Sequence, residues 1–122
     1  MTTLNVLVVD DSLISVKKLT LILEGLGHRV AGSAGTGEQA LEAYRTLLPD
    51  LVTMDITMPG MDGVEATRRI VGESPQARVL MITSHGQERM VIDALDAGAR
   101  GYVLKPVRAE KLSAMIQKVL AR

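Results

Sequence analysis

Apolar and polar positions along this chain follow two alternating patterns. Four short runs are nearly all apolar, at residues 4–9, 51–54, 79–83 and 101–104, and residues 29–34 form a fifth, weaker run. Such runs are typical of strands that are buried on both faces of a sheet. Each run is followed by a longer segment in which apolar residues recur at helical spacing. The alternation predicts one α/β domain, with a five-stranded parallel sheet and helices on both of its faces.

Each helical segment is identified by a stripe of apolar residues at helical spacing and by the residues that end it. The clearest stripe is the last: Leu112, Met115, Ile116, Val119 and Leu120. The four earlier stripes are Val16, Leu19, Leu23 and Leu26; Ala40, Tyr44, Leu47 and Leu48; Val64, Thr67, Ile70 and Val71; and Val91, Ala94, Leu95 and Gly98. Ser12 is a predicted N-cap for the first helix. Glycine or proline ends these four helices, at Gly25 and Gly27, Pro49, Gly72 and Pro75, and Gly98.

Composition narrows the class of protein. The 122 residues are 47% apolar and 23% charged, which argues against disorder, and the 14 basic and 14 acidic residues cancel. This balance, with no basic block, makes direct binding to nucleic acid a poor hypothesis. The absence of cysteine excludes disulfides, thiolate zinc sites and catalytic thiols. No signal peptide or membrane-spanning run is apparent, so we expect a cytoplasmic protein that does not insert into membranes.

A glycine-rich segment at residues 32–37 has the glycine spacing of a phosphate-binding P-loop. Glu38 and Gln39, however, occupy the positions where a P-loop has lysine and then serine or threonine. Without the lysine, the segment is better interpreted as a glycine-rich connection into the next helix.

Polar residues follow the predicted strands at the point where each one ends. They are Asp10 and Asp11, Asp55, Thr83 and Ser84, and Lys105. Because the carboxyl ends of parallel strands share one edge of the sheet, these side chains are expected to converge there. Three carboxylates would repel one another unless a cation neutralised them, and Mg²⁺ prefers such oxygen ligands. With Lys105 and the Thr83 hydroxyl nearby, the pattern predicts a site for a phosphoryl group beside a metal ion.

These motifs, taken in order, resemble the receiver domain of response regulators of the CheY type. The matching segments are Asp10-Asp11, Asp55 followed by residues 58–63, Thr83-Ser84, and residues 97–102 leading to Lys105-Pro106. The resemblance covers essentially the whole chain, so residues 1–122 are expected to form one receiver domain. It implies a flavodoxin-like, doubly wound (βα)5 fold with the strand order 2-1-3-4-5 known for CheY.

The resemblance also implies a role for each residue of the site. Asp55 would accept a phosphoryl group from a sensor histidine kinase or a histidine phosphotransfer protein. Mg²⁺ would be bound directly by Asp11 and Asp55, mainly through water by Asp10, and by the backbone carbonyl of Thr57. The remaining assignments are Lys105 and the Ser84 amide as phosphoryl contacts, Thr83 and Tyr102 as the moving switch pair, and a cis Lys105-Pro106 bond.

Two further expectations concern the lifetime and the output of the signal. In similar receivers, residues at the positions of Thr57 and His85 border the path of the attacking water. We expect slow self-dephosphorylation, with a pH dependence due to His85. Met90 and Ile92 flank the fourth stripe, where they are either scattered exposed residues or, with Tyr102, part of a partner surface. The resemblance places such a surface on the fourth helix, fifth strand and fifth helix.

Several functions are compatible with such a site. The leading hypothesis is a phosphorylation-controlled switch that changes its affinity for an unidentified output protein. The chain would alternatively be an intermediate carrier in a phosphorelay, or the receiver portion of a longer regulator. A turnover hydrolase is disfavoured, because Thr57 stands where Asp phosphatases have the second aspartate of an Asp-x-Asp pair.

Overall fold

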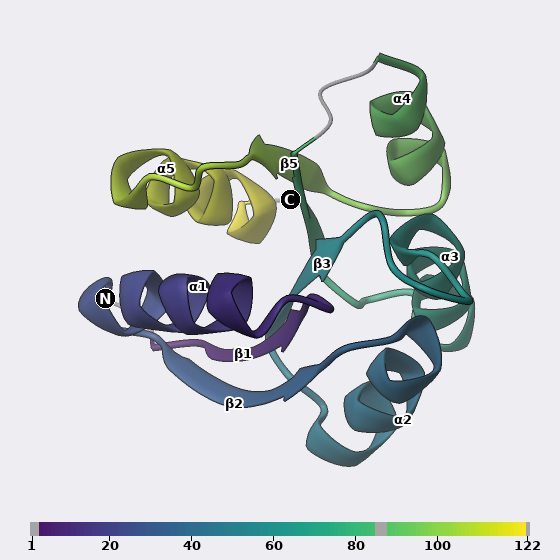
Figure 1. Ribbon diagram of the computed structural model, residues 1–122, viewed down its shortest axis with the longest axis horizontal. Coiled ribbons are helices and arrows are strands. Elements are labelled where there is room, and N and C mark those ends of the chain that lie inside the picture. The colour runs from purple at the N-terminus through teal and green to yellow at the C-terminus, as the bar shows by residue number, and fades with distance from the viewer. Residues whose placement is uncertain (1–2, 85–87, 122) are drawn as a thin grey trace.

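The computed structural model describes residues 3–84 and 88–121, in which five strands and five helices alternate (Figure 1). In chain order they are β1 (Asn5–Val9), α1 (Leu13–Gly25), β2 (Arg29–Ala34), α2 (Gly37–Leu47), β3 (Leu51–Asp55), α3 (Gly63–Glu73), β4 (Val79–Thr83), α4 (Glu88–Asp96), β5 (Gly101–Leu104) and α5 (Ala109–Leu120). The predicted α/β alternation is therefore confirmed, with strand boundaries within one residue of the apolar runs.

All four pairings in the sheet are parallel, and the strand order is β2-β1-β3-β4-β5. This confirms the order implied by the resemblance. The central strand β3 and its neighbour β4 are buried along their whole length. Their continuous apolar sequences follow from this burial, because helices cover both faces of the sheet.

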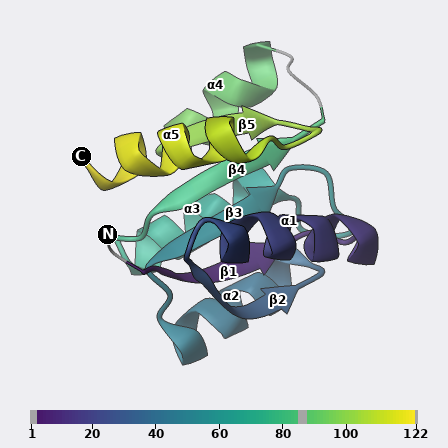
Figure 2. The same cartoon turned by 90° about the vertical axis from the view of Figure 1, so that its left-hand side faces the viewer.

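Two layers of helices enclose the sheet, and each has its own core. Figure 2 shows α1 and α5 on the face toward the viewer, with α2, α3 and α4 behind the strands. Alternate residues of each strand supply the two cores: Val6 and Val8 of β1 pack with α1 and α5, whereas Leu7 and Val9 pack with the other three helices. The period of two along the strand thus divides the apolar residues between the layers.

Side-chain caps fix where three of the helices begin. The Ser12 hydroxyl accepts a hydrogen bond from the Ser15 amide, as expected of an N-cap. Thr36 caps α2 and Asp62 caps α3 in the same way. Because Ser12 directly follows the predicted acidic pair, its cap holds the start of α1 against the edge of the sheet where the site is expected.

Two helical stripes differ from the prediction. The core-facing side of α4 is formed by the partly buried Met90, by Ala94 and, directly after the helix, by Ala97, whereas Leu95 is 43% exposed. The buried residues follow i, i+4, i+7 spacing, and Leu95 lies about 100° further around the helix axis. This short helix packs through small alanines, so the larger leucine faces solvent.

The second exception is the end of α2, where Leu47 is 40% exposed and Leu48 is 71% exposed. Leu48 has a left-handed backbone, with φ of 46°, and its amide donates to the Tyr44 carbonyl. This ends the helix and turns the Leu48 side chain out of the stripe. In the described stretches of chain, no helix is long and apolar enough to cross a membrane.

Candidate functional site

Three carboxylates meet at the carboxyl edge of the sheet. Oxygen atoms of Asp10, Asp11 and Asp55 all lie within 4.8 Å of one another. The strands account for this meeting, since Val9 is paired with Met54 and the residue after each carries a carboxylate. Asp10 and Asp55 are only 5% and 7% exposed, whereas Asp11 is exposed. The cluster therefore has a buried floor and an open side.

Lys105 brings a positive charge to this cluster from beyond the end of β5. Its Nζ atom lies 2.8 Å from Asp10 Oδ2 and 3.8 Å from Asp55 Oδ1. The backbone positions it, because the Lys105 amide donates to the Thr83 carbonyl. The Lys105-Pro106 bond is cis, as expected. The side chain thus reaches across β4 to the carboxylate at the end of β3.

The electrostatics of the cluster single out Asp55. Its pKa is raised from 3.8 to about 6, mainly by burial and next by the charge of Asp10, while Lys105 opposes both effects. Asp11 adds a smaller increase. One ammonium group is thus too little to offset the burial and the two neighbouring carboxylates. A further cation would relieve that repulsion, and three oxygen donors at this spacing suit Mg²⁺.

The loop after Asp55 is held against the sheet. The Gly63 amide donates to the Ile56 carbonyl at 2.8 Å. A β-carbon at Gly63 would collide with the Asp55 carbonyl oxygen, so only glycine fits this close approach. Gly60 follows Pro59 and has φ of 72°, a left-handed conformation that suits the third position of a type II turn. Thr57 is exposed in this loop, two residues after Asp55.

The other predicted site residues lie at the ends of β4 and on β5. Thr83 is only 1% exposed, while the next residue, Ser84, is exposed. Tyr102 is 40% exposed on β5, so its side chain faces outward in this structure. His85 lies outside the described residues.

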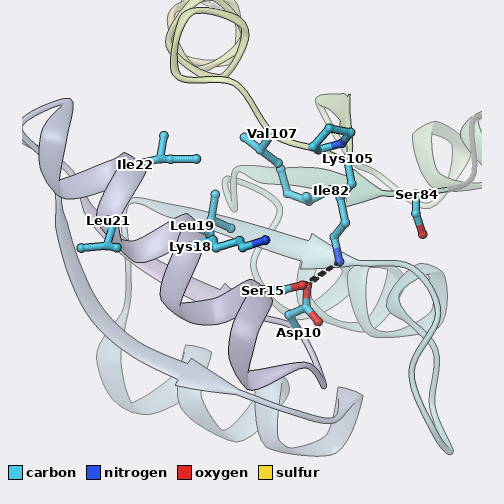
Figure 3. A pocket seen from close by; sticks show the side chains of 11 residues that line it. Asp10, Ser15, Lys18, Leu19, Leu21, Ile22, Ile82, Ser84, Lys105 and Val107 are labelled. Atoms are coloured by element: carbon cyan, nitrogen blue, oxygen red, sulfur yellow. Dashed lines mark hydrogen bonds and ion pairs between the residues drawn. The ribbon is translucent and has the colours of Figure 1, made fainter.

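One residue beside the cluster was missed by the sequence-based argument. Lys105 Nζ lies 3.5 Å from the hydroxyl of Ser15, on the first turn of α1. The same part of the molecule is hollowed between α1 and the segment after β5 (Figure 3). The sequence did contain a signal for it: Ser15 lies one helical turn after the N-cap Ser12, on the same side of α1 and so near this edge of the sheet.

Comparison with known proteins identifies the fold family. The sequence model of the response regulator receiver domain matches residues 6–117. The chain belongs to this family. Chemotaxis protein CheY of Bacillus subtilis is 44% identical over 115 residues, which cover 94% of this chain and 96% of that protein. CheY of Thermotoga maritima is 40% identical over 114 residues, which cover 93% and 95% of the two chains.

A solved receiver structure agrees with this assignment. The crystal structure of the CheX-CheY-BeF3-Mg²⁺ complex from Borrelia burgdorferi superimposes with a TM-score of 0.92. Its sequence is 38% identical, and the alignment covers 97% of this chain and 90% of that one. The chain is therefore a CheY-like receiver domain of two-component signalling. Receivers of this family are signalling switches rather than turnover enzymes, and they bind Mg²⁺ at an acidic cluster such as that of Asp10, Asp11 and Asp55.

Proposed function

We propose that this receiver is switched by transfer of a phosphoryl group to Asp55 from the phosphohistidine of a sensor kinase or a histidine phosphotransfer protein. The observation that carries the proposal is the setting of Asp55, between two other carboxylates and 3.8 Å from Lys105. A carboxylate oxygen of Asp55 attacks phosphorus, and the bond from phosphorus to the histidine nitrogen breaks. Positioning and charge neutralisation are what such a transfer requires of a protein.

Some residues around Asp55 would bind the metal ion, and others would bind the phosphoryl group. Asp11, Asp55 and the backbone carbonyl of Thr57 would hold Mg²⁺, with Asp10 acting mainly through water. The ion, when bound, neutralises charge on the carboxylates and the phosphoryl oxygens. Asp10 suits the indirect role, because its Oδ1 already accepts from the Ser12 amide and its Oδ2 is paired with Lys105.

The phosphoryl oxygens would be held by three further groups. Lys105 supplies an ammonium, Ser84 a backbone amide and Thr83 a hydroxyl. Thr83 lies buried at the end of β4, directly before the exposed Ser84. A phosphoryl group on Asp55 would draw the Thr83 side chain toward itself. This movement would change the packing around Thr83, in the space into which Tyr102 would turn.

The output surface would be formed by α4, β5 and α5. Four large apolar side chains are exposed on α4 and β5: Ile92, Leu95, Tyr102 and Leu104, each between 40% and 47% exposed. Tyr102 and Leu104 are two residues apart on the strand, so their side chains lie on the same face of the sheet. The pair on β5 includes the proposed switch tyrosine, which favours the hypothesis of a partner surface over scattered exposed residues. Its partner affinity would then depend on the state of Asp55.

Acetyl phosphate and Mg²⁺ provide the direct test of this function. The parent protein should gain one phosphoryl group by intact mass, and the adduct should be removed by hydroxylamine, as expected of an acyl phosphate. Asp55→Asn should gain none, because an amide cannot act as the nucleophile. Asp96→Asn, at the exposed end of α4, is the matched control and should be labelled like the parent. Labelling of Asp55→Asn at the parental rate would refute the assignment.

A further inference from the structure

A groove of about 640 Å³ lies between α1 and the segment that joins β5 to α5. Its walls are mainly apolar: Leu19 and Ile22 come from α1, Ile82 from β4, and Val107 from the joining segment (Figure 3). The volume lies within the range of small-molecule sites, roughly 300–1,000 Å³. An apolar space of this size, open to solvent, suits the hydrocarbon part of a ligand.

The polar end of the groove belongs to the phosphorylation site. Asp10, Ser84 and Lys105 line it, and Lys105 Nζ is 3.8 Å from Asp55 Oδ1. One side chain therefore borders both the groove and the proposed phosphoacceptor. A molecule whose phosphoryl group lies at Asp55 can place the rest of its structure in the groove.

Lys18 is a second cation in the groove. Lys18 lines the groove from α1, and among the residues of known placement no carboxylate pairs with it. In Figure 3 its side chain extends toward the side on which Ser15 and Lys105 lie. Lys105, in contrast, is already paired with Asp10. The groove thus combines an apolar wall with an unneutralised positive charge, which is complementary to an apolar molecule that carries or releases an anion.

We propose that the groove binds the leaving group of an acyl phosphate donor with an apolar chain. This inference rests on the proposed function of Asp55. The Asp55 carboxylate forms a bond to phosphorus, the bond from phosphorus to the acyl oxygen breaks, and its electron pair departs with the fatty carboxylate. No proton is transferred. The chain of the acyl group packs on Ile22 and Val107, and Lys18 stabilises the charge that develops on the departing carboxylate.

Chain length is therefore the variable to test. Hexanoyl phosphate should label Asp55 at least about tenfold faster than acetyl phosphate at low donor concentration, since each buried methylene group strengthens binding severalfold. Ile22→Gln should reduce this ratio toward one, whereas Lys18→Met should slow labelling by both donors, because both release a carboxylate. Their matched controls are Leu48→Gln at the end of α2 and Lys17→Met on α1. Both control residues are exposed and lie outside the groove lining, so the labelling rates and their ratio should stay parental.

A binding measurement separates the groove from the chemistry. Hexylphosphonate, which cannot transfer its phosphoryl group, should shift the methyl NMR resonances of Ile22 and Val107, and methylphosphonate should not. A rate ratio near one while acetyl phosphate still labels Asp55 would overturn this inference alone, leaving the groove as a surface for protein contact. Failure of both donors to label Asp55 would overturn the proposed function and this inference with it.

Discussion

Asp10 and Lys105 form the closest ion pair of the site, with 2.8 Å between Oδ2 and Nζ. The other oxygen of Asp10 accepts a hydrogen bond from the Ser12 amide. Both oxygens of Asp10 are thus engaged, whereas the neighbouring Asp11 is exposed and has no such partner among the hydrogen bonds of the described residues. The two adjacent aspartates therefore suit different roles: Asp10 pairs with Lys105, and Asp11 is available to bind a metal ion.

This difference predicts unequal effects on Mg²⁺ binding. Asp10→Ala removes an outer contact and should weaken Mg²⁺ binding by roughly tenfold, in the range known for groups that orient metal ligands. Asp11→Ala removes a direct ligand and should weaken it further. Calorimetric titration of both variants at neutral pH would measure this, with Asp96→Ala as the control. Equal losses in the two variants would contradict the division of roles.

The raised pKa of Asp55 makes stability depend on pH. Its value of about 6 exceeds the 3.8 of an ordinary carboxyl, so the folded protein binds this proton more tightly than the unfolded chain does. The stability that protonated Asp55 contributes is present below about pH 4 and is lost as pH rises through about 6. Two pKa units correspond to at most about 3 kcal/mol, and solvent at the open side of the cluster reduces this.

Asp55→Asn should therefore raise the free energy of unfolding by about 1–2 kcal/mol at about pH 8 without metal, and by much less near pH 4. Urea unfolding with a chelator present would measure both values. Asp96→Asn serves again as the control, since its carboxylate lies on the exposed end of α4. A gain that did not vary with pH would have some cause other than the titration of Asp55.

Two glycines of α3 allow the loop geometry to be tested on a single helix. Gly63→Ala should cost about 1–3 kcal/mol, as overpacking does, and should slow phosphorylation, because the new methyl group displaces the Asp55 peptide. A methyl group at Gly72 meets nothing within 4 Å, so Gly72→Ala should add about 0.5–1 kcal/mol through helix propensity. Unfolding and acetyl phosphate labelling of both variants would measure these effects. Parental labelling of Gly63→Ala would show that the close approach does not position Asp55.

The sequence predicted those parts of the molecule that depend on repeating patterns. Asp10, Asp55 and Lys105 were placed together correctly, because apolar runs locate the strands and parallel strands end at one edge. The burial of Leu95 was predicted wrongly. On this short helix the predicted stripe of Val91, Leu95 and Gly98 and the observed one of Met90, Ala94 and Ala97 are offset by a single residue. Packing against α3, which helix propensity does not describe, decides between them.

The groove could not be predicted, for a different physical reason. Its walls come from α1, β4 and the segment after β5, and each of these reads as an ordinary amphipathic or apolar element. The groove depends on the distance between α1 and the segment after β5, which is set by side-chain packing over the whole face. No local pattern encodes that distance.

The outward position of Tyr102 gives the switch an optical test. The chain has two tyrosines and no tryptophan, so in a Tyr44→Phe background the tyrosine fluorescence comes from Tyr102 alone. Tyr102 is 40% exposed, and acrylamide should quench it readily in the unphosphorylated protein. If phosphorylation turns the ring inward, quenching should fall.

Thr83→Ala should separate phosphorylation from this response. The buried Thr83 lies at the end of β4, beside the strand that carries Tyr102, where Met81 is paired with Tyr102 and Thr83 with Leu104. The alanine variant keeps Asp55 and Lys105, so acetyl phosphate should still label it. It lacks the hydroxyl through which the phosphoryl group favours one arrangement of this region, and a ligand shifts an equilibrium only through such differential contacts. Quenching of Tyr102 should then stay the same on labelling, and Thr83→Ser, which restores the hydroxyl, should recover the change. A parental fall in quenching in Thr83→Ala would show that the ring responds to Asp55 by a route that does not include Thr83.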